Sequence, residues 1–182
     1  MKDMSTANAL KDMSVTNDLK DDYCCESCRL YNSENKCYAL FISKINNRNC
    51  LLVTLEQNYY RLPGGSIDEG ECKTKCIKRE CEEEIKLKIS VDVNKCRKFI
   101  LENKVPSLCY IITKENIDID ELNRKINMDN LNESLPYYLR EVSYCNWLDI
   151  DSGKIIGETN ENNKITKLVC LALNKLRKIY LD

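Results

Sequence analysis

The sequence predicts one α/β domain. Two short runs rich in β-forming residues, 38–43 and 50–54, are separated by turn-prone asparagines and indicate a hairpin. Two longer segments, 71–85 and 163–180, carry apolar residues at helical spacing, which predicts two amphipathic helices. Strands mixed with such helices are typical of an α/β fold. Further strands are expected near residues 96–101, 108–113 and 141–148.

The beginning of the chain differs in composition from the rest. Residues 2–10 and 11–19 are a near repeat that opens with Lys-Asp-Met-Ser, and two copies are too few for a repeat fold. A segment this polar buries too little apolar surface to hold a fixed structure. We therefore expect residues 1–33 to form a disordered tail, with a short docking helix as the alternative, and residues 34–182 to form the domain.

Targeting signals and net charge indicate in which compartment the protein resides and which partners it attracts. The start of the chain lacks the apolar segment of a signal peptide, and no apolar run is long enough to span a membrane. We therefore expect a cytoplasmic or nuclear protein, without a membrane partner, whose 12 cysteines are reduced. A formal net charge of −1 indicates no general attraction to nucleic acid. No pattern in the sequence indicates an oligomeric state.

The sequence contains no histidine. This excludes a Ser-His-Asp triad, a Cys-His dyad and a histidine-ligated zinc ion. Any acid–base chemistry must therefore come from carboxylates, lysine, tyrosine or cysteine.

Three glutamates of the predicted helix 71–85 lie on one face. Glu80, Glu83 and Glu84 are three and four positions apart, so their carboxylates neighbour one another. At an effective dielectric of about 20, two such carboxylates repel by roughly 3 kcal/mol, whereas a hard divalent cation would reverse the sign. The preceding Gly64-Gly65 leads toward a helix N-terminus, where anions are favoured. A metal-dependent site for a diphosphate is one interpretation, and a solvated acidic helix face is the other.

This region resembles the Nudix box, written G-x5-E-x7-R-E-U-x-E-E-x-G-U with U a bulky aliphatic residue. The lead-in Tyr-Arg-Leu-Pro-Gly-Gly at 60–65 is similar to the family's W-x-L-P-G-G. The resemblance extends over about residues 36–182 and implies a Nudix-type α/β/α sandwich with a central mixed sheet. The matching positions of the box are Gly65, Glu71, Arg79, Glu80, Glu83 and Glu84.

The resemblance implies a role for each glutamate of the shared face. Glu83 and Glu84 would bind Mg²⁺ or Mn²⁺, with the backbone carbonyl of Gly65 as a further ligand. Glu80 would either bind the metal or act as the base that activates water. The implied reaction is hydrolysis of a diphosphate bond by metal-activated water.

The remaining box positions have supporting roles or depart from the family pattern. Arg79 would orient Glu80 or Glu71 through ion pairs, and Glu71 would be structural, with direct ligation of the metal as the alternative. Lys86 stands where the family has glycine. A non-glycine residue in a left-handed conformation costs on the order of 1 kcal/mol, so Lys86 is expected to perturb the helix end and spare the carboxylates.

One cysteine motif raises the question of a second metal. Cys25 and Cys28 form a C-x-x-C motif, which is a zinc-binding spacing. A zinc ribbon needs a second close pair, whereas the next cysteines, Cys37 and Cys50, are isolated and lie in predicted strands. Zinc binding, a redox pair and no function therefore remain open for this motif.

The substrate is the least determined feature of the sequence. The resemblance implies a nucleoside diphosphate linked to another group. Tyr60 and Tyr110 are candidates for stacking on a base, although tyrosines in strands more often pack in a core. Lysines and an arginine on the helix 163–180 could bind an RNA 5′ end, or simply face solvent. The alternatives are mRNA decapping, hydrolysis of nucleoside triphosphates, and a Nudix module that binds a nucleotide without turnover.

Overall fold

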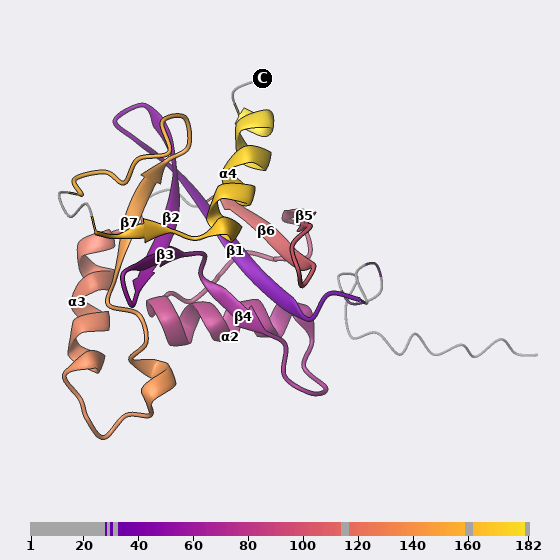
Figure 1. The fold of residues 1–182 in the computed structure, drawn as a ribbon. Coiled ribbons are helices and arrows are strands. Elements are labelled where there is room, and N and C mark those ends of the chain that lie inside the picture. Colours follow the sequence, from indigo (N-terminus) through magenta and orange to yellow (C-terminus); the bar gives the residue numbers. More distant parts are fainter. Residues whose placement is uncertain (1–27, 29, 31–32, 114–116, 159–161, 181–182) are drawn as a thin grey trace, which may run out of the picture.

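The computed structural model describes residues 28, 30, 33–113, 117–158 and 162–180 (Figure 1). The tail expected at residues 1–33 lies almost entirely outside this part of the chain, so its predicted disorder is untested. Cys28 is an exception, because it is described and contacts the start of a helix of the domain.

A mixed sheet of eight strands forms the centre of the domain (Figure 1). Its main path runs in the order β5-β6-β1-β2-β3-β8, while β4 pairs with β1 and β7 pairs with β2. The strands are β1 (Lys36–Ile45), β2 (Arg48–Glu56), β3 (Tyr59–Arg61), β4 (Gly64–Ser66), β5 (Arg97–Leu101), β6 (Ser107–Thr113), β7 (Tyr144–Asp149) and β8 (Lys164–Ile165). β1 runs parallel to β6 and β3 runs parallel to β8, whereas the other pairs are antiparallel.

Helices cover both faces of this sheet. The helical elements are α2 (Lys73–Ile85), α3 (Ile119–Asn130), the short 3-10 helix η1 (Tyr137–Leu139) and α4 (Lys167–Tyr180). Apolar residues of α2 and α3 share one core with the sheet, and those of α4 share a second core on the other side. The structure therefore confirms the predicted α/β/α sandwich with a mixed sheet.

The hairpin and the two helices predicted from the sequence are present. β1 and β2 are joined through Asn46 and Asn47, which adopt φ values of 50° and 62°. Positive φ at both central residues is what a tight hairpin turn requires, and asparagine tolerates it. The C-terminal helix starts later than expected, at Lys167, because residues 164–165 form an additional strand.

Helix α3 was not predicted. It begins at Asp118, whose side chain accepts a hydrogen bond from the amide of Glu121 and so caps the helix. Only Leu122 and Ile126 of this helix are buried, which leaves a weak apolar pattern in the sequence. No helix in the described part of the chain is long and apolar enough to cross a membrane.

Candidate active site

The position of α2 on the sheet determines where its glutamates point. Cys76, Ile77, Cys81 and Ile85 are fully buried against the sheet. Because these residues recur at helical spacing, the opposite and lateral faces of α2 carry its charged side chains.

Glu82 occupies the outward position that this register gives it. Its side chain is 55% exposed and pairs with Lys88 at 3.2 Å. The carboxylates of Glu80 and Glu83, by contrast, both lie within hydrogen-bonding distance of Arg79. The structure thus separates Glu82 from the glutamates that share a face.

Strand β4 brings glycine backbone against the carboxylates of α2. The amide of Gly64 donates a hydrogen bond of 2.8 Å to Oε2 of Glu84. A Cβ on Gly64 would lie 2.2 Å from the carbonyl oxygen of Cys37, and a Cβ on Gly65 would lie 2.7 Å from Oε1 of Glu80. Gly64 is therefore required for the close approach of β4 to β1, whereas a side chain at position 65 would displace the carboxylate of Glu80.

Arg79 is the centre of an ion-pair network. Its Nε and Nη2 donate to the two carboxylate oxygens of Glu71, at 2.9 and 2.8 Å. Its Nη1 donates to Glu80 at 2.9 Å and to Glu83 at 3.1 Å. These contacts lower the pKa of Glu71 and raise that of Arg79. Arg79 is thus placed to orient Glu80, Glu83 and Glu71.

Glu84 and Glu80 differ from ordinary surface glutamates. Burial raises the pKa of Glu84 to about 8, although the hydrogen bond from Gly64 acts in the opposite direction and neighbouring carboxylates add to the increase. Burial also raises the pKa of Glu80, whereas Arg79 lowers it. Both carboxylates are therefore harder to ionise than a solvent-exposed glutamate.

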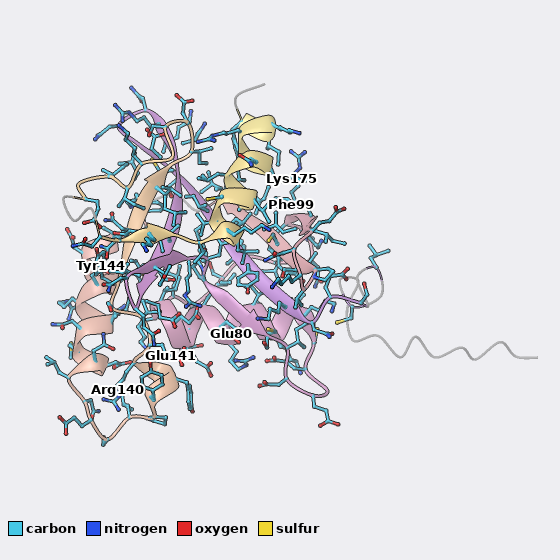
Figure 2. The ribbon with its side chains drawn as sticks, in the orientation of Figure 1. Glu80, Phe99, Arg140, Glu141, Tyr144 and Lys175 are labelled. Atoms are coloured by element: carbon cyan, nitrogen blue, oxygen red, sulfur yellow. The ribbon has the colours of Figure 1, made fainter. Side chains whose placement is uncertain are left out.

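These carboxylates line a cavity of about 380 Å³. Two of its other lining residues, Tyr138 and Glu141, come from the segment between α3 and β7 and were not expected from the sequence. Figure 2 shows Glu141 on the same side of the sheet as Glu80. Nothing in the sequence relates Glu141 to a box more than fifty positions earlier, because only the fold brings the two segments together. The cavity is lined by Asp68, Arg79, Glu80, Glu83, Glu84, Tyr138 and Glu141.

A larger cavity, of about 560 Å³, lies at the end of α4 and is lined by residues such as Arg97, Ile111 and Tyr180. Among the described residues that line it, Asp92 is the one carboxylate. The smaller cavity is the better candidate for chemistry because it gathers five carboxylates.

The two tyrosines considered for substrate stacking lie elsewhere. Tyr60 is only 1% exposed; its hydroxyl donates to a carboxylate oxygen of Glu158 and is hydrogen-bonded with the hydroxyl of Tyr144. Tyr110 is fully buried in the core beneath α2. The suggestion that Tyr60 and Tyr110 bind substrate is therefore corrected: both pack inside the domain, and Tyr138 is the aromatic residue at the cavity.

The basic side chains of α4 are also remote from the cavity. Lys175 lies on the far side of the sheet from Glu80 (Figure 2). Arg177 is engaged in the fold, because its guanidinium donates to the carbonyl oxygens of Ile150 and Asp151 at 2.8 and 2.9 Å. This placement gives no support to α4 as the holder of an RNA 5′ end above the glutamates.

Lys86 does more than end the helix. It adopts φ 57° and ψ 28°, the left-handed conformation expected at the glycine position of the box. Its ammonium donates to the carbonyl oxygens of Glu83 and Leu139, at 2.5 and 3.2 Å, and pairs with Asp129 at 2.8 Å. Lys86 thus ties the end of α2 to α3 and to η1, the element that carries Tyr138.

Replacing Lys86 by Gly is expected to destabilise the protein by about 1 to 2 kcal/mol. Glycine would relieve about 1 kcal/mol of left-handed strain, but the lost hydrogen bonds of a mostly buried ammonium are worth more. Urea unfolding measures the difference, with Asp129→Asn as the matched control that removes the ion pair and keeps the backbone. A Lys86→Gly protein about 1 kcal/mol more stable than the original chain would mean that only the strain is relieved and that the tether contributes nothing.

The residues around the cavity fit a hard divalent cation. Glu80, Glu83, Glu84 and Glu141 offer the oxygen ligands that Mg²⁺ and Mn²⁺ prefer. Burial raises the pKa values of Glu80, Glu84 and Glu141, and a bound cation would favour their ionised forms. Among the described residues, no group of three or more acidic or thiol side chains is drawn together tightly enough to form a metal site as it stands.

Comparison with known proteins supports the fold. The sequence matches no protein-family model and no curated relative. The structure resembles that of an Ap4A hydrolase from C. elegans, with a TM-score of 0.50 and 14% identity, over 80% of this chain and 97% of that chain.

Two further solved structures are similar at lower scores. The pyrophosphohydrolase BsRppH of Bacillus subtilis has a TM-score of 0.48 and 13% identity, over 82% of this chain and 84% of that chain. The NUDIX domain of NrtR from Shewanella oneidensis, complexed with ADP ribose, has a TM-score of 0.44 and 13% identity, over 82% and 92%. Together with the topology, the likeness to the Ap4A hydrolase shows that this chain has the Nudix fold.

Proposed function

We propose that this protein is a metal-dependent hydrolase that cleaves the diphosphate bond of a nucleoside diphosphate linked to another group. The observation that carries the proposal is the cavity in which Glu80, Glu83, Glu84 and Glu141 meet beside Arg79. A solvated acidic helix face would leave its carboxylates exposed and unpaired, whereas Glu84 is partly buried and accepts a hydrogen bond from Gly64 of β4.

The glutamates of α2 have distinct proposed roles. Glu83 and Glu84 hold Mg²⁺ or Mn²⁺ together with the carbonyl oxygen of Gly65. The bound cation supplies Lewis acidity and lowers the pKa of water at the site. Glu80 accepts the proton of the attacking water or holds the cation as well. Its partial burial suits this role, because a base must exchange protons near the working pH.

Arg79 and Glu71 support these groups. The two-pronged pairing of Arg79 with Glu71 fixes the plane of the guanidinium, so that Nη1 meets Glu80 and Glu83 in a defined geometry. Glu71 acts through Arg79 in this proposal and does not ligate the metal itself.

The boundaries of the catalytic domain and the compartment of the protein rest on the sequence alone. We propose that residues 34–182 contain all of the chemistry, and that the protein acts in the cytoplasm or nucleus. Tyr138, which is 56% exposed at the cavity, is available to contact the base of a nucleotide. Because α4 lies across the sheet from the cavity (Figure 2), its basic side chains give no support to decapping. No observation favours triphosphate hydrolysis over this proposal.

A substrate panel tests the proposal. Purified protein would be incubated with Mg²⁺ or Mn²⁺ and nucleotide sugars, dinucleoside polyphosphates, ADP-ribose, capped RNA and nucleoside triphosphates, and the products separated by anion-exchange chromatography. We expect cleavage of at least one diphosphate-linked nucleoside and loss of cleavage in excess EDTA. Tight binding of these nucleotides without turnover would instead identify a binding module.

A further inference from the structure

Two cysteines meet at the start of α2, outside the cavity. The sulfur of Cys28 lies 3.9 Å from that of Cys72, although 44 positions separate the two residues along the chain. Cys72 is the N-cap residue of α2, and Cys28 is the last cysteine of the C-x-x-C motif. The fold thus supplies this motif with a close neighbour that the sequence does not reveal.

Each of the two sulfur atoms lies beside a polar group of α2. The amide of Lys73, the first residue of α2, donates to the sulfur of Cys28 at 3.3 Å. The hydroxyl of Thr74 lies 3.1 Å from the sulfur of Cys72. A helix N-terminus and direct N–H donors favour the thiolate form, which is the reactive form of cysteine.

Solvent access distinguishes this pair of cysteines from a second pair of cysteines beside α2. Cys28 is half-buried, whereas Cys72 is 5% exposed, so Cys28 is the member of the pair that a small oxidant in solvent would meet first. Cys37 and Cys76 also adjoin each other, but both are fully buried. Hydrogen bonding to Cys37, together with burial, raises the pKa of Cys76 well above its ordinary value. The inner pair is therefore protected from oxidation by burial, and Cys76 also by its raised pKa.

We propose that Cys28 and Cys72 form a reversible disulfide when the protein meets a hydroperoxide. The thiolate of Cys28 attacks the peroxide, the O–O bond breaks, hydroxide leaves, and the sulfur becomes a sulfenic acid. Cys72 then attacks this sulfur, the S–O bond breaks, and the departing hydroxide takes the thiol proton to become water. In sum, two thiols and one hydrogen peroxide give one disulfide and two waters.

The disulfide joins the segment around residue 28 covalently to the helix that carries the glutamates. It closes a long loop that includes β1 to β4, and cross-links that close long loops restrict the unfolded chain most. The oxidised protein is therefore more resistant to heat than the reduced protein, independently of any enzymatic activity.

Peptide mapping of the full chain tests the disulfide. Reduced protein is desalted, treated with a few equivalents of hydrogen peroxide, alkylated and digested with trypsin without reduction. Cleavage after lysine and arginine places Cys28 in residues 21–29 and Cys72 in residues 62–73. We expect these two peptides to be cross-linked, at the sum of their masses less two hydrogens, and to separate with dithiothreitol. The melting temperature should rise by about 5–10 °C on oxidation.

Variants assign the bond to the correct sulfur atoms. Because residues 21–29 also contain Cys24 and Cys25, the mapping is repeated with both replaced by serine, and the cross-link should persist. Cys28→Ser and Cys72→Ser should abolish it, whereas the matched control Cys96→Ser, at another half-buried cysteine, should not. A Cys24→Ser/Cys25→Ser protein that forms no such cross-link would overturn the proposal. So would one equivalent of zinc in the purified protein that Cys72→Ser loses, since the thiols would then be metal ligands.

Discussion

Replacing Glu83 by Gln is expected to lower turnover by about a hundredfold or more. Glutamine keeps the size of the side chain but removes its charge, so the proposed cation loses a strong ligand. The same replacement at Glu82, one position away, is expected to leave turnover within a few-fold. Glu82 is exposed and pairs with Lys88. Steady-state rates on the best substrate of the panel, at saturating Mg²⁺, measure the contrast.

The other two glutamates should lose comparable activity for different reasons. Glu84→Gln weakens the metal site, whereas Glu80→Gln should also change the acidic limb of the rate–pH profile, because a general base must be ionised to act. Urea unfolding of each variant separates lost chemistry from lost folding. If Glu82→Gln proves as damaging as Glu83→Gln, the division of α2 into a catalytic face and a solvent face is incorrect.

A second large effect is expected on stability in the absence of metal. The folded protein holds the pKa of Glu84 at about 8, above its ordinary value of 4.5. Between these two values the folded state binds more protons than the unfolded state, so the free energy of unfolding decreases as pH rises. This contribution is complete below pH 4.5 and is lost as pH rises through 8. This contribution amounts to a few kcal/mol at most.

Urea unfolding in EDTA from pH 5 to pH 8 measures this loss. Glu84→Gln, which cannot ionise, should flatten most of the slope and leave a smaller part, since Glu80 and Glu141 also have raised pKa values. Addition of Mg²⁺ should restore stability to the original chain near pH 8. An unchanged pH slope in Glu84→Gln would contradict the burial of an ionisable carboxylate at this position.

The register of α2 was predictable because it depends on local spacing. Buried residues such as Cys76, Ile77 and Cys81 recur at helical intervals, and this places Glu80 and Glu83 together whatever the rest of the chain does. The hairpin was predictable for the same reason, since a turn of asparagines between two β-rich runs is a local signal.

The far wall of the cavity was not predictable. Tyr138 and Glu141 reach it only because α3 docks beneath the sheet and Lys86 ties η1 to the end of α2. These contacts join residues about fifty positions apart, and no spacing rule encodes them. The sequence suggested only that Lys86 costs backbone strain, whereas the structure reveals a tether.

The burial of the two candidate tyrosines was not predictable either. Tyr60 and Tyr110 lie in strands, and a strand places alternate side chains on opposite faces. Whether a given face meets solvent or a helix depends on the layers above it. Here α4 covers the face of Tyr60 and α2 covers that of Tyr110, so both became core residues.

The central claim is that the glutamates of α2 bind a divalent cation, and titration with Mn²⁺ tests it without knowledge of the substrate. Isothermal titration calorimetry would compare the original chain with Glu83→Gln, Glu84→Gln and Glu82→Gln at pH 8. We expect binding in the original chain and in Glu82→Gln, and binding weakened by about tenfold or more in the other two. Equal Mn²⁺ binding in all four proteins, or none in the original chain, would contradict the account.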